Sequence, residues 1–151
     1  MNIYKAGLIL LMSILLANPV TAETMKYTGT IHASSNKSLM PLANGNGVLL
    51  LEASGIAALS GKPPSVLAVK CSGMGMVDAK SKAKTDFYCS FTESEEDGFD
   101  VKGIIHDESG NFDVIGGSGK WSLAKGKGKF VQVIKTSAGS KNVFEMEITT
   151  P

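Results

Sequence analysis

Residues 115–130 read IGGSGKWSLAKGKGKF and place five glycines and four lysines around Trp121, the only tryptophan of the chain. A phosphate-binding P-loop has two glycines separated by four residues, then Lys and Ser or Thr, between a strand and a helix. Neither that spacing nor the helix is present, and the βαβ unit of a dinucleotide-binding site is also missing. Glycines inside strands instead mark bulges, tight corners and close backbone approaches. The stretch therefore indicates a strongly curved β-sheet, with Trp121 and Phe130 filling a barrel or closing one of its ends.

A period of two runs through the rest of the chain. Residues 142–149, NVFEMEIT, alternate apolar side chains with two glutamates, and residues 86–92, DFYCSFT, place Phe87, Cys89 and Phe91 on one face. Such alternation is what a sheet with one solvent-facing side requires. Similar runs of strand-forming residues cover 25–33, 47–54, 65–73, 99–107, 111–117 and 129–136.

Short turn signals separate these runs. Asp97–Gly98 and Gly110–Asn111 are typical hairpin connectors, because both pairs tolerate positive φ. Residues 55–60, GIAALS, are a competing helix candidate, and residues 77–85 read as a polar, lysine-rich loop. The pattern predicts an all-β protein: a single antiparallel meander β-barrel of about eight strands, preceded by a cleaved signal peptide. Closure removes exposed strand edges, and a two-sheet sandwich is the alternative.

The first 22 residues have the three parts of a secretory signal peptide. One lysine precedes the apolar run AGLILLMSILLA, and Val20 and Ala22 occupy positions −3 and −1 of a cleavage site before Glu23. The apolar run is too short to span a bilayer comfortably, and no later stretch could do so. We therefore expect a signal peptide at 1–22, one barrel domain at 23–151, no membrane span after cleavage, and a periplasmic or secreted location.

Export would place Cys71 and Cys89 in an oxidising compartment, where two cysteines in strand-like runs are expected to form a disulfide bond. A redox or metal-binding pair is the weaker alternative, because CxxC spacing is absent. The formal net charge is +1, and every basic residue is a lysine. Arginine suits bidentate contacts to phosphate and guanine, so its absence leads us to expect no nucleic-acid partner.

The segment GGSGKWSLAKGKGKF resembles the GG-T/S-G-K-aromatic…G-x-G-x-aromatic segment of allene oxide cyclase and dirigent-like (calycin-type) β-barrels. The same pattern occurs in small exported bacterial proteins of unknown function. Upstream, PPSVLAVKCSGMG and YCSFTESEEDGFD resemble the proline pair, the two cysteines and the acidic Asp-Gly turn of the bacterial group. The resemblance spans roughly residues 45–131 and implies an eight-stranded barrel with a partly hollow interior. No catalytic residue of the plant enzyme can be placed on this sequence, and residues 122–124 depart from the usual pattern of that turn.

Several charged or sulfur-containing groups invite a functional interpretation. The acidic run 93–100, ESEEDGFD, matches only part of an EF-hand loop, so a solvated hairpin tip is favoured and a weak calcium site stays open. His32 and His106 lack an evident nucleophile and orienting acid, so we expect them at the surface. Met74 and Met76 suit Cu(I), but core packing is the more common role of such residues.

A second group of residues is basic. Lys120, Lys125, Lys127 and Lys129 form a local patch that could attract an anionic polymer or lipid head group. The favoured interpretation is an ordinary barrel exterior, because acidic residues elsewhere balance the charge.

Three functional hypotheses follow. The first is an exported, non-enzymatic barrel that binds a small apolar ligand in its interior. The second is a cyclase-like enzyme that confines a lipid-like substrate, and the third is a structural or interaction protein of the envelope with a filled barrel. We expect no catalytic residue, metal ligand or cofactor. The residues expected in the interior, and therefore at the ligand, are Tyr27, Phe87, Phe99, Trp121 and Phe130.

Overall fold

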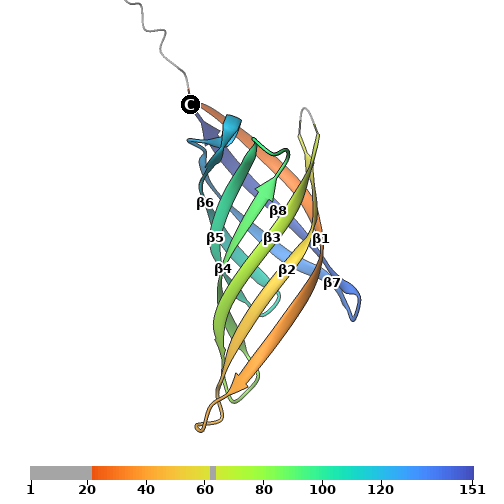
Figure 1. The fold of residues 1–151 in the computed structure, drawn as a ribbon, viewed down its shortest axis with the longest axis vertical. Coiled ribbons are helices and arrows are strands. Elements are labelled where there is room, and N and C mark those ends of the chain that lie inside the picture. Colours follow the sequence, from red (N-terminus) through yellow and green to blue (C-terminus); the bar gives the residue numbers. More distant parts are fainter. Residues whose placement is uncertain (1–21, 62–63) are drawn as a thin grey trace, which may run out of the picture.

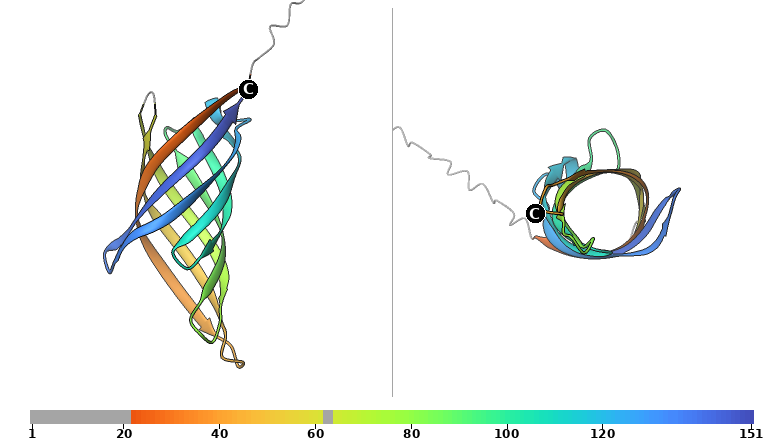
Figure 2. Two further views of the ribbon diagram at one scale, coloured as in Figure 1. Left: turned by 180° about the vertical axis from the view of Figure 1, so that it is seen from behind. Right: turned by 90° about the horizontal axis from the view of Figure 1, so that it is seen from below.

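The structure, a computed structural model, describes residues 22–61 and 64–151. Eight antiparallel strands follow one another around a closed barrel in chain order, and β8 pairs with β1 (Figures 1 and 2). This confirms the predicted meander barrel and excludes the two-sheet sandwich. The strands are β1 (Glu23–Pro41), β2 (Gly47–Ser60), β3 (Ser65–Val77), β4 (Ala83–Thr92), β5 (Gly98–His106), β6 (Ser109–Ser118), β7 (Lys125–Thr136) and β8 (Gly139–Thr150).

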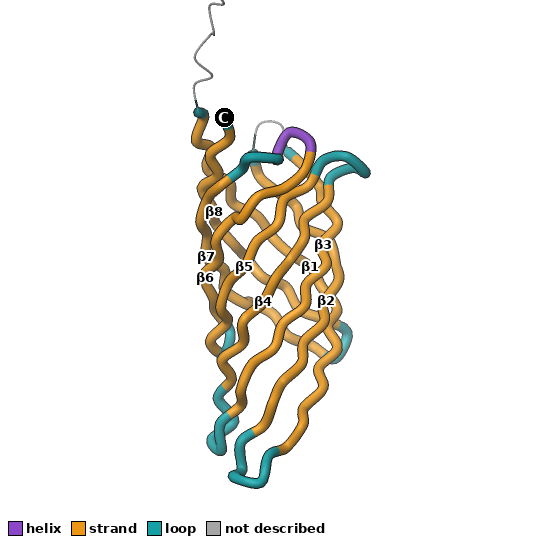
Figure 3. Tube along the Cα trace, turned by 60° about the vertical axis from the view of Figure 1, so that its left-hand side comes forward, coloured by secondary structure: helices purple, strands orange, loops and turns teal. Residues whose placement is uncertain are grey.

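One short 3₁₀ helix, η1 (Gly119–Trp121), interrupts the strands between β6 and β7. It lies at one end of the barrel, beside the chain ends of β1 and β8 (Figure 3). No helix among residues 22–61 and 64–151 is long and apolar enough to cross a membrane. Residues 1–21 of the predicted signal peptide lie outside the described residues.

The structure excludes the helix candidate and one of the two hairpin connectors. Residues 55–60 are the last part of β2 rather than a helix, and β1 and β3 supply their backbone hydrogen-bond partners. Gly110 and Asn111 lie inside β6, and the turn before them is Asp107–Glu108, where Asp107 adopts a φ of 54°. A short polar side chain tolerates this left-handed conformation, so the turn did not require glycine.

Along each strand, alternate side chains point into the barrel and away from it, as the sequence predicted. Phe144, Met146 and Ile148 of β8 are buried in the interior, and Phe87 and Phe91 of β4 face the same space. Burial of such side chains supplies the main stabilising free energy of the fold. The interior is therefore aromatic-rich, although the barrel wall contains many glycines.

Four phenylalanine rings lie over a glycine that is directly opposite on the neighbouring strand. A Cβ atom on any of these glycines would lie less than 3.0 Å from the facing aromatic ring. The missing side chain therefore provides the space in which each ring lies against the barrel wall, the arrangement known as aromatic rescue of strand glycines. The pairs are Gly29–Phe144, Phe87–Gly103, Gly110–Phe130 and Phe112–Gly128.

The outer face of β6, β7 and β8 carries rows of alternating charge. Lys127 lies opposite both Asp113 and Glu147 in the strand register, and Lys129 Nζ lies 2.8 Å from Glu145 Oε1. Lys127 and Lys129 face outward as predicted, but acidic neighbours accompany them. These rows favour an ordinary solvated exterior over a free basic surface.

We expect Gly128→Ala to lower the free energy of unfolding by about 1–3 kcal/mol, because the new methyl group meets the Phe112 ring and the Glu145 carbonyl. Urea unfolding measures the change. The matched control is Lys127→Ala, which faces outward on the same strand and should change stability by only about 0.5 kcal/mol or less. Equal stabilities of Gly128→Ala and Lys127→Ala would contradict the role assigned to the glycine.

Candidate functional site

The barrel interior contains a cavity of about 160 Å³. Side chains from all eight strands line it, and its deeper wall is apolar, with Ile31, Val69, Phe87, Phe112 and Phe130 among the lining residues. Its mouth lies at the end of the barrel away from η1 and is polar. The mouth residues are Lys37, Asp107, Glu108, Gln132, Lys135, Ser140 and Asn142.

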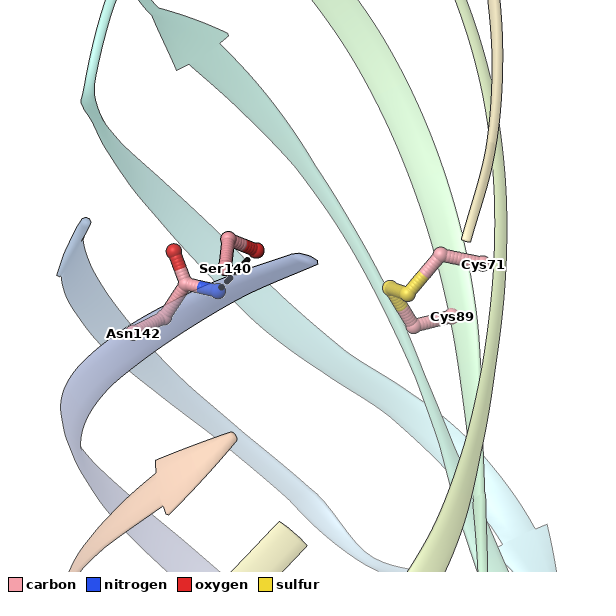
Figure 4. The surroundings of a disulfide bond; sticks show 4 residues. All are labelled: Cys71, Cys89, Ser140 and Asn142. Atoms are coloured by element: carbon pink, nitrogen blue, oxygen red, sulfur yellow. Dashed lines mark hydrogen bonds between the residues drawn. A yellow bond between two sulfur atoms is a disulfide. The ribbon is translucent and has the colours of Figure 1, made fainter. Parts of the chain in front are cut away.

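A disulfide bond joins Cys71 of β3 to Cys89 of β4 and forms part of the cavity wall. The two cysteines are directly opposed in the register, with their Cα atoms 4.0 Å apart. Figure 4 shows the disulfide facing into the barrel, with Ser140 and Asn142 of β8 on the opposite side. The predicted disulfide is confirmed, and it indicates an oxidising environment for the folded chain.

The opposite end of the barrel is packed solid around Trp121. The Trp121 ring centroid lies 5.2 Å from that of Phe99 and 6.3 Å from that of Tyr27, and Phe91 stacks on Phe99 at 4.9 Å. Offset and edge contacts of this kind add to the stabilisation from burial alone. Trp121 therefore plugs one end of the barrel, which is one of the two roles predicted for it.

The five residues predicted for the interior thus divide into two groups. Phe87 and Phe130 line the cavity, and their rings meet edge to face with centroids 5.8 Å apart. Tyr27, Phe99 and Trp121 belong to the packed end and are not part of the cavity wall. The interior is consequently hollow in one half and filled in the other.

An ion pair fastens the plug to the barrel. Lys120 Nζ lies 2.6 Å from Glu93 Oε2, and Ser65 Oγ donates a hydrogen bond of 3.0 Å to Glu93 Oε1. The Lys120 backbone N–H donates to Asp97 Oδ1 at 2.9 Å. The hydrogen bond from Lys120 holds the pKa of Glu93 below its usual range, and burial opposes that effect only in part.

Glycine is required where the plug begins. Gly119 has a φ of 54°, in the left-handed region, and a Cβ atom there would collide with the Asp97 carboxylate. Asp97 can therefore reach the backbone of η1 only because the side chain at position 119 is absent.

These contacts change how the acidic run 93–100 is interpreted. Glu93 and Asp97, two of the possible calcium ligands, are engaged by Lys120 and by the start of η1. In the part of the chain that the structure describes, no three His, Cys, Asp or Glu side chains gather as they would around a metal ion. The run acts as the partner of the plug.

Two other sequence expectations have different outcomes. His32 and His106 lie on the outer face of the barrel, as expected. Met74 and Met76 do not pack in the core; their side chains are 61% and 46% exposed. The inward positions of that part of β3 belong to Gly73 and Gly75, where a Cβ atom would collide with the backbone of β4.

Sequence reasoning missed the polar mouth. Lys37 is in phase with Ile31 and Ala33 on the inward face of β1, so the alternation itself could have revealed it. Lys135 carries no such signal, because a register shift between Gln132 and Ile134 breaks the alternation of β7.

Comparison with known proteins supports the fold. No family model and no curated protein matches the sequence. The structure resembles a solved one described as the pterocarpan synthase dirigent protein GePTS1, with a TM-score of 0.53 and 10% identity over 86% of each chain. The pterocarpan synthase dirigent protein PsPTS1 aligns with a TM-score of 0.44 and 9% identity, over 87% of this chain and 96% of that one. The first match and the closed meander together show a dirigent-like β-barrel, as the sequence motif predicted.

We expect the plug contact to make stability depend on pH. Because folding lowers the pKa of Glu93, its contribution is complete above the pKa of an unfolded glutamate, about 4.3, and is lost as the pH falls through the lower folded value. Glu93→Gln should cost about 1 kcal/mol or less at neutral pH, since Lys120 is half exposed. Thermal unfolding followed by Trp121 fluorescence measures both effects.

The matched control for Glu93 is Glu95→Gln, which removes the same charge from an exposed position of the same turn. A wild-type protein and a Glu93→Gln variant with the same acid dependence would contradict the assigned ion pair.

The disulfide closes a segment with a sequence separation of 18 residues, so replacing both cysteines by alanine should lower stability by about 3 kcal/mol. A reductant should lower the unfolding temperature of the wild-type protein and leave that of the Cys71→Ala/Cys89→Ala variant unchanged. If the wild-type protein unfolds at the same temperature with and without the reductant, the bridge contributes no stability.

Proposed function

We propose that this protein is exported and that its barrel binds a small apolar ligand in the cavity between Phe87, Phe130 and the disulfide. The observation that carries the proposal is an apolar cavity that all eight strands enclose, open through a polar mouth and closed at the far end by Trp121. Concave sites with apolar walls and a few polar groups are the usual form of small-molecule sites.

The size of the cavity limits the ligand. Its volume of about 160 Å³ is close to that of an engineered apolar cavity that takes up benzene, about 150 Å³. The part of the ligand that enters the barrel is therefore a single aromatic ring or a short alkyl chain. The free volume favours this function over a filled structural barrel.

Binding is favoured over catalysis because the ionisable groups that line the cavity gather at its mouth. They are Lys37, Asp107, Glu108 and Lys135, while the deep wall consists of apolar side chains and the disulfide. An acid–base catalyst must lie within hydrogen-bond reach of the reacting atoms. A ligand seated in the apolar depth would keep most of its atoms away from these groups.

Export is supported by two independent observations. The first 22 residues have the pattern of a signal peptide, and the folded domain carries a disulfide. We propose a periplasmic or secreted location on this basis. The fold is shared with the solved structure described as a pterocarpan synthase dirigent protein.

Filling the cavity should weaken binding. Ala53 of β2 lines the cavity, so Ala53→Phe should weaken the binding of toluene by about tenfold or more. Ala58→Phe places the same side chain on the outer face of the same strand and should leave binding unchanged. Ligand-observed NMR measures the affinity.

Native mass spectrometry of the exported protein would show whether it retains a small molecule.

Equal toluene affinities of wild type and Ala53→Phe, with the fold of both verified by circular dichroism, would exclude the cavity as the binding site.

A further inference from the structure

Two lysines face the mouth of the cavity. Lys37 follows Ile31, Ala33 and Ser35 on the inward side of β1, and Lys135 lies opposite Ser140, another residue of the cavity wall. Within the described residues, no carboxylate lies within 4.0 Å of either ammonium group. Two cations therefore border an apolar cavity without an ion-pair partner.

A β-bulge in β7 directs Lys135 inward. Phe130 and Gln132 line the cavity, so uninterrupted alternation would place Ile134 inside and Lys135 outside. The register instead skips Val133, so that Ile134 lies opposite the outward Lys141 and Lys135 opposite the inward Ser140. The chain thus exposes half of the Ile134 side chain and brings a charge to the cavity. Bulges that re-aim side chains in this way are common beside functional sites.

The surroundings of Lys37 favour an added negative charge. Burial lowers the pKa of Lys37, and the nearby Lys135 ammonium lowers it further. An anion between the two groups would relieve their repulsion and supply charge-assisted hydrogen bonds. The acidic residues of the mouth, Asp107 and Glu108, belong to the β5–β6 turn, which adjoins β7: the Glu108 carbonyl accepts a hydrogen bond of 2.7 Å from the Gln132 N–H. Neither carboxylate lies within 4.0 Å of the Lys37 or Lys135 ammonium group.

We propose that the ligand is an amphipathic monocarboxylate, whose apolar ring or chain enters the barrel and whose carboxylate binds between Lys37 and Lys135. This inference rests on the proposed function and names the chemical class of its ligand. The cavity limits the size of the apolar part, and the two lysines select the charge of the head group.

Three ligands that share an apolar phenylalkyl part and differ in the head group test the preference for a carboxylate: 4-phenylbutyrate, 4-phenylbutanol and 4-phenylbutylamine. By isothermal titration calorimetry at neutral pH and low salt, the wild-type protein should bind the acid about tenfold more tightly than the alcohol. Lys37→Met and Lys135→Met should each reduce that preference, measured as the ratio of the acid affinity to the alcohol affinity of the same variant. Lys70→Met, which removes the same charge from the outer face of β3, should retain it.

The outcomes separate the two proposals. If the alcohol binds the wild-type cavity as well as the acid does, or if the amine binds best, the carboxylate assignment is wrong while the apolar site stands. If both lysine variants keep the preference for the acid, the anion is bound elsewhere. If none of the three ligands binds, the proposed function and the ligand class both fail.

Discussion

The pairing of phenylalanine with glycine across neighbouring strands is the constraint on which the rest of the structure depends. A barrel of eight strands has room for few large side chains, and an aromatic ring needs a flat surface on which to lie. Phe112 and Phe130 lie over Gly128 and Gly110, so their rings lie close against the barrel wall. Both rings form part of the wall of the cavity. The glycines therefore shape the interior as well as allowing the sheet to bend.

The two ends of the barrel differ in what occupies the interior: one is filled and the other is open. At one end, η1 turns Trp121 inward, and the ion pair between Lys120 and Glu93 holds the turn against the β4–β5 loop. At the other end the interior stays open, and polar side chains replace the aromatic ones. Filling one end supplies burial that a small domain needs for stability, while the other end stays open.

The sequence predicted the barrel, the disulfide and most inward residues because these follow from alternation and turn chemistry, which are local properties. It did not predict that Met74 and Met76 face outward, since only the approach of β4 reveals that the inward neighbours must be glycine. Nor did it predict the inward direction of Lys135, because a bulge is a property of two paired strands rather than of one. The division of the aromatic residues between plug and cavity likewise depends on η1, three residues whose conformation is set by tertiary contacts.

The pairing of β1 with β8 joins Glu23 to Thr150, near opposite ends of the polypeptide. Seven of the eight strand pairings join strands that follow one another in the sequence, but the eighth joins the first strand to the last. The ring of backbone hydrogen bonds therefore closes only when these two strands, which lie far apart in the sequence, come together. Because residues of all eight strands line the cavity, it exists only once that ring is closed.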